Sequence, residues 1–261
     1  MNGIERIAQV FSAGRPAFMP YAVLGYPTPD ASLEIIQTLV TAGADALELG
    51  VPFSDPLADG PTIQAATQCA LNNGLTVAGC LDMVARLRAR GVQTPALLMG
   101  YVNPILAYGL PRFVADSAAA GVDGFIIPDL PPEEAGELCV ACESHGLAMT
   151  FLAATTSTTE RLALIGEKST GFVYLVSVTG VTGMRDHLPA DLAGFVARAR
   201  QSTRRPLAVG FGIGTGPQAR TVAGLADGVI VGSALVKAAG ESLASVRQRA
   251  GELAEAIHRQ A

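Results

Sequence analysis

Glu48 is the residue whose type and position first suggest chemistry. It lies in the hydrophobic segment ADALELG (44–50), between Leu47 and Leu49. If this segment is a strand, alternation puts Glu48 on one face and both leucines on the other. A carboxyl buried on that face has a raised pKa, which suits a general acid or base near neutral pH. A structural ion pair is the alternative, but no Lys or Arg occurs between residues 16 and 85.

The segment that follows, VPFSDPLADGP (51–61), holds three prolines and two acids in eleven residues. Because it leaves the same strand end as Glu48, it can bring Asp55 or Asp59 over the same pocket. Two carboxylates in different environments can divide acid and base roles there. The alternative for either aspartate is that it caps a helix beginning near Pro61.

Two glycine clusters occur late in the chain, GFGIGTG (210–216) and Gly232–Ser233. They match neither the dinucleotide fingerprint nor the P-loop, so they give little support to a nucleotide site. Backbone N–H groups at a helix N-terminus bind anions, and α/β barrels commonly build a phosphate site after their last two strands. The glycines therefore predict an anion site, with simple tight turns as the alternative.

Other polar motifs predict less. The segment SVTGVTG (177–183) is typical of a lid with glycine hinges. The three histidines lack metal-ligand spacing, and Cys139 and Cys142 form a C-x-x-C without a second pair. No metal site is predicted.

Segments rich in β-forming residues alternate with longer amphipathic segments from end to end. The expected strands are 17–25, 44–51, 95–101, 123–129, 148–154, 171–178, 206–212 and 227–233. The expected helices are 30–42, 61–90, 103–120, 133–145, 159–167, 188–202, 215–223 and 234–258. This order predicts an α/β fold, a single (β/α)8 TIM barrel spanning 1–261, with a doubly wound sheet as the alternative. In such a barrel Glu48 faces the lumen near the C-terminal strand ends, where barrel enzymes place their chemistry.

A short signature recurs before three of the expected strands, in AGADALELG, AGVDGFIIPD and GLADGVIVGS. In each, a glycine near the end of a helix is followed by an aspartate and a hydrophobic strand. The glycine allows a left-handed helix stop, and Asp45, Asp123 and Asp227 are expected to hold the turns into the strands.

The composition excludes several classes of protein. The chain is 49% hydrophobic and 16% charged, with a formal net charge of -5, and its 18 basic residues are scattered, which argues against a nucleic-acid partner. No apolar run reaches the roughly 18 to 20 residues of a membrane-spanning helix. Residues 1–14 suit an amphipathic helix rather than a signal peptide, so a cytoplasmic protein with reduced cysteines is expected.

The string LELGVPFSDPLADGPTIQ (47–64) closely resembles the tryptophan synthase alpha subunit family, as do GVTG (180–183), GFGI (210–213) and VGSALV (231–236). The resemblance runs over essentially the whole chain. It implies a barrel whose bottom is closed by an extra N-terminal helix within 1–14.

The resemblance implies a lyase of tryptophan biosynthesis, which cleaves indole-3-glycerol phosphate to indole and glyceraldehyde 3-phosphate without a cofactor in this chain. Glu48 then matches the catalytic acid/base, and Asp59 matches the carboxylate that holds the indole N–H. Indole passes to a beta subunit, which carries pyridoxal phosphate, in an α2β2 tetramer. A stand-alone lyase that releases free indole and a catalytically silent scaffold are the alternatives.

The resemblance also assigns supporting residues. The residues expected at the substrate pocket are Tyr21, Tyr101, Ile127, Tyr174 and Thr182. The residues expected at the phosphate are Gly183, Gly212, Gly232 and Ser233. The residues expected to face the beta subunit are Pro52, Asp55 and Pro56. The chain departs from the commonest family pattern at Tyr26 and at Val178.

Overall fold

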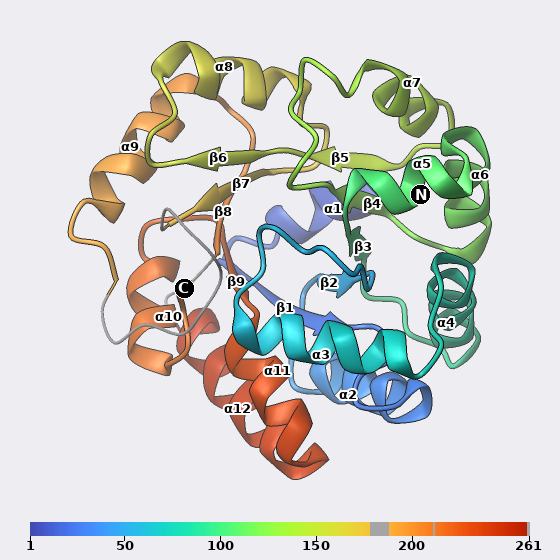
Figure 1. Cartoon of the computed structure of the whole chain (residues 1–261). Coiled ribbons are helices and arrows are strands. Elements are labelled where there is room, and N and C mark those ends of the chain that lie inside the picture. Colours follow the sequence, from blue (N-terminus) through green and yellow to red (C-terminus); the bar gives the residue numbers. More distant parts are fainter. Residues whose placement is uncertain (178–187, 211, 260–261) are drawn as a thin grey trace.

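The computed structural model describes residues 1–177, 188–210 and 212–259. Within them, nine parallel strands form one sheet in the order β5-β4-β3-β2-β1-β9-β8-β7-β6 (Figure 1). The strands are β1 Ala17–Val23, β2 Leu47–Gly50, β3 Ala96–Met99, β4 Gly124–Ile126, β5 Ala148–Thr150, β6 Leu152–Ala154, β7 Val173–Val176, β8 Leu207–Gly210 and β9 Gly228–Val231. The two ends of that order, β5 and β6, are separated in the chain only by Phe151, so the sheet curls into a barrel. The barrel prediction is confirmed, with the expected strand 148–154 divided in two.

The described helices surround the barrel on its outer side, except for the first one, which lies across one end of the barrel (Figure 1). They are α1 Gly3–Phe11, α2 Pro29–Thr41, α3 Pro61–Asn72, α4 Val77–Ala89, α5 Val102–Tyr108, α6 Leu110–Ala120, α7 Gly136–Ser144, α8 Thr159–Lys168, α9 Leu192–Ser202, α10 Gly216–Ala223, α11 Ser233–Glu241 and α12 Leu243–His258. The predictions of one helix over 61–90, 103–120 and 234–258 were wrong, because each range contains two helices.

Local backbone chemistry explains each of these breaks. Gly74 has a φ of +79° and Thr76 caps α4 with its side chain. Gly109, with a φ of +95°, separates α5 from α6. Ser242 caps α12 with its hydroxyl. The apolar spacing continues across all three breaks, so periodicity alone does not reveal them.

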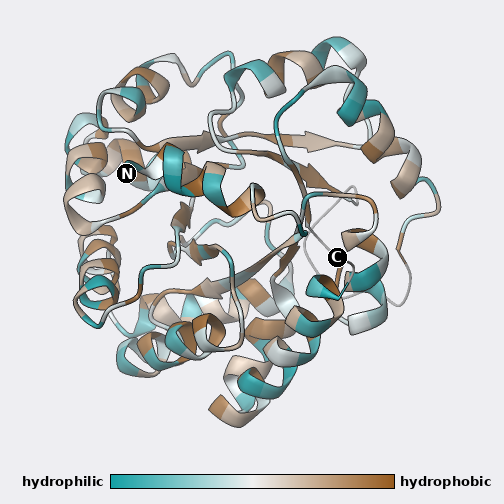
Figure 2. Ribbon diagram, turned by 180° about the vertical axis from the view of Figure 1, so that it is seen from behind, coloured by the Kyte–Doolittle hydropathy of each residue, from teal (hydrophilic) through white to brown (hydrophobic). Residues whose placement is uncertain are grey.

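The core has two layers on either side of the strands. Side chains that point into the lumen form one cluster, which includes Met19, Tyr21, Leu97, Ile126, Phe172, Tyr174, Ala208 and Ile230. The alternate strand residues pack with the helices in a second cluster, which includes Phe18, Leu47, Leu49, Leu98, Phe125, Val209 and Val229. Both faces of the parallel strands are therefore apolar, as the brown strands in Figure 2 show. Alternation places Glu48 with the lumen residues, as predicted.

Helix α1 packs against the N-terminal end of the barrel. A capping box formed by Asn2 and Glu5 begins the helix, and the backbone N–H of Ile4 donates to a loop carbonyl ahead of β5. Ile7 is buried among the lumen residues, and the Phe11 ring lies 5.5 Å from that of Phe172. The apolar face of α1 thus covers residues that would otherwise face water.

The three aspartates of the recurring signature join neighbouring strands at this same end. Each accepts the backbone N–H of a residue at the start of the preceding strand: Asp45 from Phe18 at 2.8 Å, Asp123 from Ala96 at 2.8 Å and Asp227 from Leu207 at 2.7 Å. Each also forms an ion pair with arginine: Asp45 with Arg15, Asp123 with Arg6 and Arg88, and Asp227 with Arg200. The expectation that they hold turns was incomplete, because they also connect adjacent βα units.

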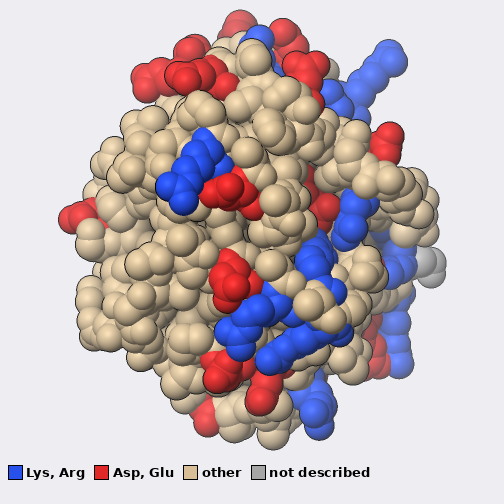
Figure 3. Space-filling view, turned by 90° about the vertical axis from the view of Figure 1, so that its right-hand side faces the viewer, with Lys and Arg blue, Asp and Glu red and all other residues tan. Residues whose placement is uncertain are grey.

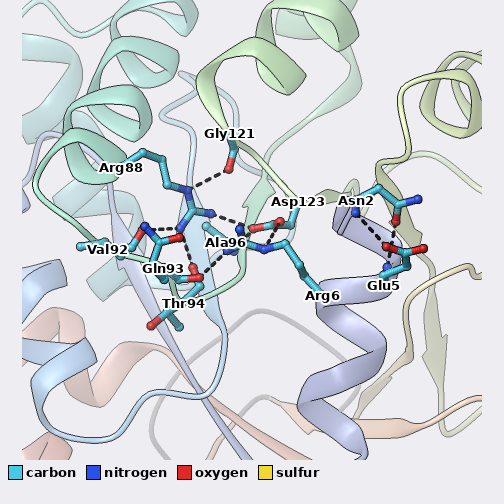
Figure 4. A network of polar contacts seen from close by, with 10 residues as sticks. All are labelled: Asn2, Glu5, Arg6, Arg88, Val92, Gln93, Thr94, Ala96, Gly121 and Asp123. Atoms are coloured by element: carbon cyan, nitrogen blue, oxygen red, sulfur yellow. Dashed lines mark hydrogen bonds and ion pairs between the residues drawn. The ribbon is translucent and has the colours of Figure 1, made fainter.

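The network around Asp123 is the most extensive of the three (Figure 4). Arg6 and Arg88 contact its two oxygens at 2.9 and 2.7 Å, and the Asp123 side chain is only 5% exposed. Arg88 also donates to the carbonyls of Gly121, Val92 and Thr94. Burial raises the pKa of Asp123 while both arginines lower it. This carboxylate therefore ties α1, α4 and two strands together.

Charged side chains lie on the outside in mixed groups. On the face in Figure 3, basic side chains gather in one area with acidic side chains beside them. Much of the rest of that face is uncharged. No described helix has the length and apolar character that crossing a membrane requires.

Replacing Asp123 tests the structural role of this network. Asp123→Asn is expected to lower the free energy of unfolding by about 3 kcal/mol, because it leaves two partly buried guanidinium groups without their charge partner. The matched control is Asp30→Asn, which removes an ion pair whose aspartate is 82% exposed and should cost under about 1 kcal/mol. Urea denaturation measures both, and equal losses in the two variants would contradict this role.

Candidate active site

A cavity of about 390 Å³ opens at the C-terminal ends of the strands. Side chains from β1, β2, β3, β7 and β9 line it, together with the loops after β2, β8 and β9. The lining residues are Tyr21, Glu48, Asp59, Ile63, Met99, Tyr174, Gly212, Ile213, Ile230, Gly232 and Ser233. Acidic and aromatic groups from distant parts of the sequence thus meet in one place.

Glu48 is the most deeply buried acid of this cavity, with 1% of its surface exposed. It pairs in register with Tyr21 of β1 and Leu97 of β3. Among the described residues, neither carboxyl oxygen has a hydrogen-bond partner. Burial, and secondarily the charge of Asp59, raise the pKa of Glu48 to about 8. The carboxyl is therefore mostly protonated at pH 7 and can give up a proton there.

Asp59 reaches the same cavity from the loop after β2. Its backbone N–H donates to the Pro56 carbonyl, and its own carbonyl accepts from the Gln64 side chain at 2.8 Å. The Tyr101 hydroxyl donates to Oδ2 at 3.1 Å, whereas Oδ1 has no partner among the described residues. Burial raises the pKa of Asp59 to about 6, and the bond from Tyr101 opposes that rise. At neutral pH the two carboxyls consequently differ in charge.

Neither loop aspartate caps a helix. The N-cap of α3 is Gly60, and the side chains of Asp55 and Asp59 make no cap hydrogen bond within the described residues. Asp55 is exposed, accepts a hydrogen bond from Ser54 and does not line the cavity. The capping alternative is wrong for both aspartates, and of the two only Asp59 shares the cavity with Glu48.

Tyr21 and Tyr174 line the cavity together with Glu48, and each phenol ring lies over a glycine of the next strand. A Cβ built on Gly50 would come within 2.1 Å of the Tyr21 hydroxyl, and one on Gly210 within 2.3 Å of the Tyr174 hydroxyl. Burial raises the pKa of both phenols well above the ordinary value. Gly210 therefore has a packing role that the prediction of an anion-binding cluster did not include.

Tyr101 and Ile127 do not line this cavity. Tyr101 stands behind Asp59 and reaches the site only through its hydroxyl. Ile127 faces the helices and lines a separate cavity of about 240 Å³ with Ile105 and Phe113. The expectation that Ile127 lies at the substrate pocket fails because strand alternation turns its neighbour Ile126, not Ile127, into the lumen.

Gly212, Gly232 and Ser233 also line the cavity, from the loops after β8 and β9. Ser233 begins α11, and no side-chain hydrogen bond caps that helix. In contrast, Thr215 and Gln218 form a capping box on α10. The N–H groups of Leu235 and Val236 donate to the Gly232 carbonyl. Because no described side chain caps α11, the N–H groups of Ser233 and Ala234 make its N-terminus the better site for an anion.

Several predicted residues lie outside the cavity or outside the described part of the chain. Thr182 and Gly183 fall in the segment that the structure does not describe. Pro52 is buried, whereas Asp55 is exposed and Pro56 partly exposed. Asp55 and Pro56 border a surface groove of about 1150 Å³ beside the 81% exposed Leu57. Of the three residues expected at a partner surface, Asp55 and Pro56 are accessible to a partner, whereas Pro52 is buried within this chain.

Residues 1–177, 188–210 and 212–259 contain no cluster of three His, Cys, Asp or Glu side chains that could hold a metal ion. The four cysteines are free. The cavity also includes Met99, Ile213 and Ile230, which the sequence analysis did not select. Met99 and Ile230 could have been predicted by applying to their strands the same alternation of lumen-facing and helix-facing side chains that was used for Glu48.

Comparisons with known proteins agree with this geometry. The family model for the tryptophan synthase alpha chain matches residues 7–261. The tryptophan synthase alpha chain of Chloroflexus aggregans is 53% identical over 237 residues, covering 90% of this chain and 89% of the relative. That of a Caulobacter strain is 47% identical over 260 residues, covering 97% and 94%.

Solved structures give the same result. A chain of Mycobacterium tuberculosis tryptophan synthase superposes with a TM-score of 0.91 at 43% identity, covering 97% of this chain and 98% of that one. Tryptophan synthase subunit alpha of Legionella pneumophila gives 0.90 at 36% identity, with 98% of each chain covered. This chain belongs to the tryptophan synthase alpha chain family.

Proposed function

We propose that the chain is the alpha subunit of a tryptophan synthase and cleaves indole-3-glycerol phosphate to indole and glyceraldehyde 3-phosphate. The observation that carries the proposal is that one cavity holds both a protonated Glu48, which has no hydrogen-bond partner among the described residues, and an ionised Asp59. The N-terminus of α11, which no described side chain caps, lines the same cavity. The substrate has matching groups: the N–H of an aromatic indole ring at one end, a phosphate at the other and the bond to be broken between them.

Glu48 supplies the proton transfers. Its raised pKa keeps the carboxyl protonated, so it can protonate indole C3 and convert the ring to an indolenine. The resulting carboxylate then takes the proton of the glycerol C3′ hydroxyl as the bond between indole C3 and C3′ breaks. The electrons of that bond return to the indole ring, the C3′ carbon becomes the aldehyde, and Glu48 ends in its starting state.

Asp59 stabilises the charge that develops in the ring. Protonation at C3 leaves a positive charge on the indole nitrogen, and an ionised carboxylate that accepts the N–H lowers the energy of that state. The unpartnered Oδ1 of Asp59 is the oxygen free to do this. Phosphate binding at Gly212, Gly232 and Ser233 then fixes the other end of the substrate.

The partner we propose is a tryptophan synthase beta subunit, in an α2β2 assembly that carries pyridoxal phosphate only in the beta chain. The groove bordered by Asp55 and Pro56 supports this, since exposed Leu57 lies beside it on the loop that carries Asp59. A partner bound there contacts the same loop that positions the catalytic carboxylate.

The test of this function is indole release from indole-3-glycerol phosphate by the purified chain, alone and with an added beta subunit. Slow release that rises strongly with the beta subunit supports the proposal. Fast release by the chain alone would replace it with a stand-alone lyase, and no release in either case would refute it.

Glu48→Gln should lower kcat by about 10²–10⁴-fold, because the amide cannot transfer the proton.

The same variant should be more stable than the wild type at high pH. A buried carboxyl with a raised pKa opposes folding only once it ionises, so the penalty is absent below about pH 4.5 and complete above about pH 8. The gain at pH 9 should be on the order of 4 kcal/mol. Exposed Glu34→Gln is the control for both assays, and wild-type kcat in Glu48→Gln would contradict the assignment.

The pH dependence of kcat/KM should be bell-shaped. The rate rises as Asp59 ionises near pH 6 and falls as Glu48 loses its proton near pH 8. Steady-state assays between pH 5 and pH 9.5 measure it. A rate that keeps rising above pH 9 would mean that Glu48 acts first as a base.

Ser233→Asp should raise KM for indole-3-glycerol phosphate by about 10-fold or more, because it puts a negative charge where the phosphate binds. Ser242→Asp makes the same change at the N-cap of α12, which does not line the cavity, and should leave KM unchanged. Equal KM values in the two variants would place the phosphate elsewhere.

A further inference from the structure

Tyr101 is the one described residue whose side chain hydrogen-bonds to the Asp59 carboxyl. Its hydroxyl also accepts the backbone N–H of Ala58 at 3.0 Å. A phenol has a single proton, and the N–H of Ala58 occupies part of its acceptor side. The proton is therefore directed to Oδ2 of Asp59, and one hydroxyl holds both the loop backbone and the loop carboxylate.

The phenol itself is firmly held. Its ring lies 5.5 Å from that of Phe53 and borders the small apolar cavity that includes Ile105. At the start of α5, the next backbone N–H, that of Val102, donates to both oxygens of Asp129 at 3.0 and 3.3 Å. The hydroxyl thus reaches Asp59 from a position fixed by β3, α5 and the loop after β4.

We propose that Tyr101 is a positioning residue for Asp59: its hydroxyl engages Oδ2 and turns Oδ1 toward the substrate. This inference rests on the function proposed above. Tyr101 was expected in the wall of the substrate pocket, but it lies behind the reacting carboxylate of Asp59 instead.

The charges around Asp59 make this bond important. Among the residues that the structure describes, the other ionisable groups that face it are Glu48 from β2, Tyr21 from β1 and Tyr174 from β7, and none of these three carries a positive charge. Burial disfavours the ionised form of Asp59, and the bond from Tyr101 is what offsets it. Without that hydroxyl, Asp59 should hold its proton nearer to neutral pH, where it cannot stabilise a positive indole nitrogen.

The decisive variant is Tyr101→Phe, which keeps the ring and removes the hydroxyl. A matched control exists in Tyr108→Phe, which removes a hydroxyl that donates to Asp116 at 2.7 Å outside the cavity. Carboxyl ¹³C NMR titration of the full-length chain, with Asp59→Asn to assign the signal, reports the pKa of Asp59 directly. We expect it to rise by about one unit in Tyr101→Phe and to stay unchanged in Tyr108→Phe.

Kinetics should change in the same direction. At pH 5.5, Tyr101→Phe should lower kcat about 8-fold with less than about a 3-fold change in KM, and most of the loss should disappear at pH 8. Difluorotyrosine at position 101 is a more acidic donor and should move the Asp59 pKa down instead. An unchanged Asp59 pKa in Tyr101→Phe, or a loss of kcat that is equal at every pH, would overturn the inference.

The two proposals fail separately. If the wild-type chain does not cleave indole-3-glycerol phosphate, the proposed function is wrong, yet the NMR titration still decides whether Tyr101 controls Asp59. If cleavage occurs and the titration shows no shift, Tyr101 is only a packing residue and the function stands.

Discussion

The structure depends on keeping one carboxyl, Glu48, out of water without a hydrogen-bond partner among the described residues. In most folds a buried acid is either neutralised by a basic residue or hydrogen-bonded by the backbone. Here the lumen of the barrel surrounds Glu48 with apolar side chains and two phenols, and its pKa rises accordingly. A proton donor that works near neutral pH is the direct result of that desolvation.

The two ends of the barrel use acidic residues in opposite ways. At the N-terminal end, Asp45, Asp123 and Asp227 each accept a backbone N–H and pair with arginine. At the C-terminal end, Glu48 has no described partner and Asp59 has one. The aspartates paired with arginine connect the βα units and stabilise the fold. Their contribution offsets the free-energy cost of burying Glu48 and Asp59 without a basic partner among the described residues. Stability and chemistry are thereby separated along the barrel axis, as in other barrels of this kind.

Much of this site could be predicted from the sequence, for physical reasons that also explain the failures. Strand alternation around Glu48 gave the correct face, because a parallel strand buried on both sides has only two directions for a side chain. The same alternation, applied to Ile127, would have corrected its placement. The partner of Asp59 could not be predicted, since the contact with Tyr101 spans 42 positions in the sequence and depends on how the loop after β2 folds back. The helix breaks at Gly109 and Ser242 were missed because apolar spacing says nothing of caps.

The protonation state of Glu48 in the free chain tests this account most directly. Difference infrared spectroscopy of the wild type against Glu48→Gln isolates the carbonyl stretch of that one carboxylic acid. The account predicts a protonated acid band at pH 7 that disappears with a midpoint near pH 8. A carboxylate already ionised at pH 6 would contradict it, because Glu48 would then have no proton to give to the indole ring.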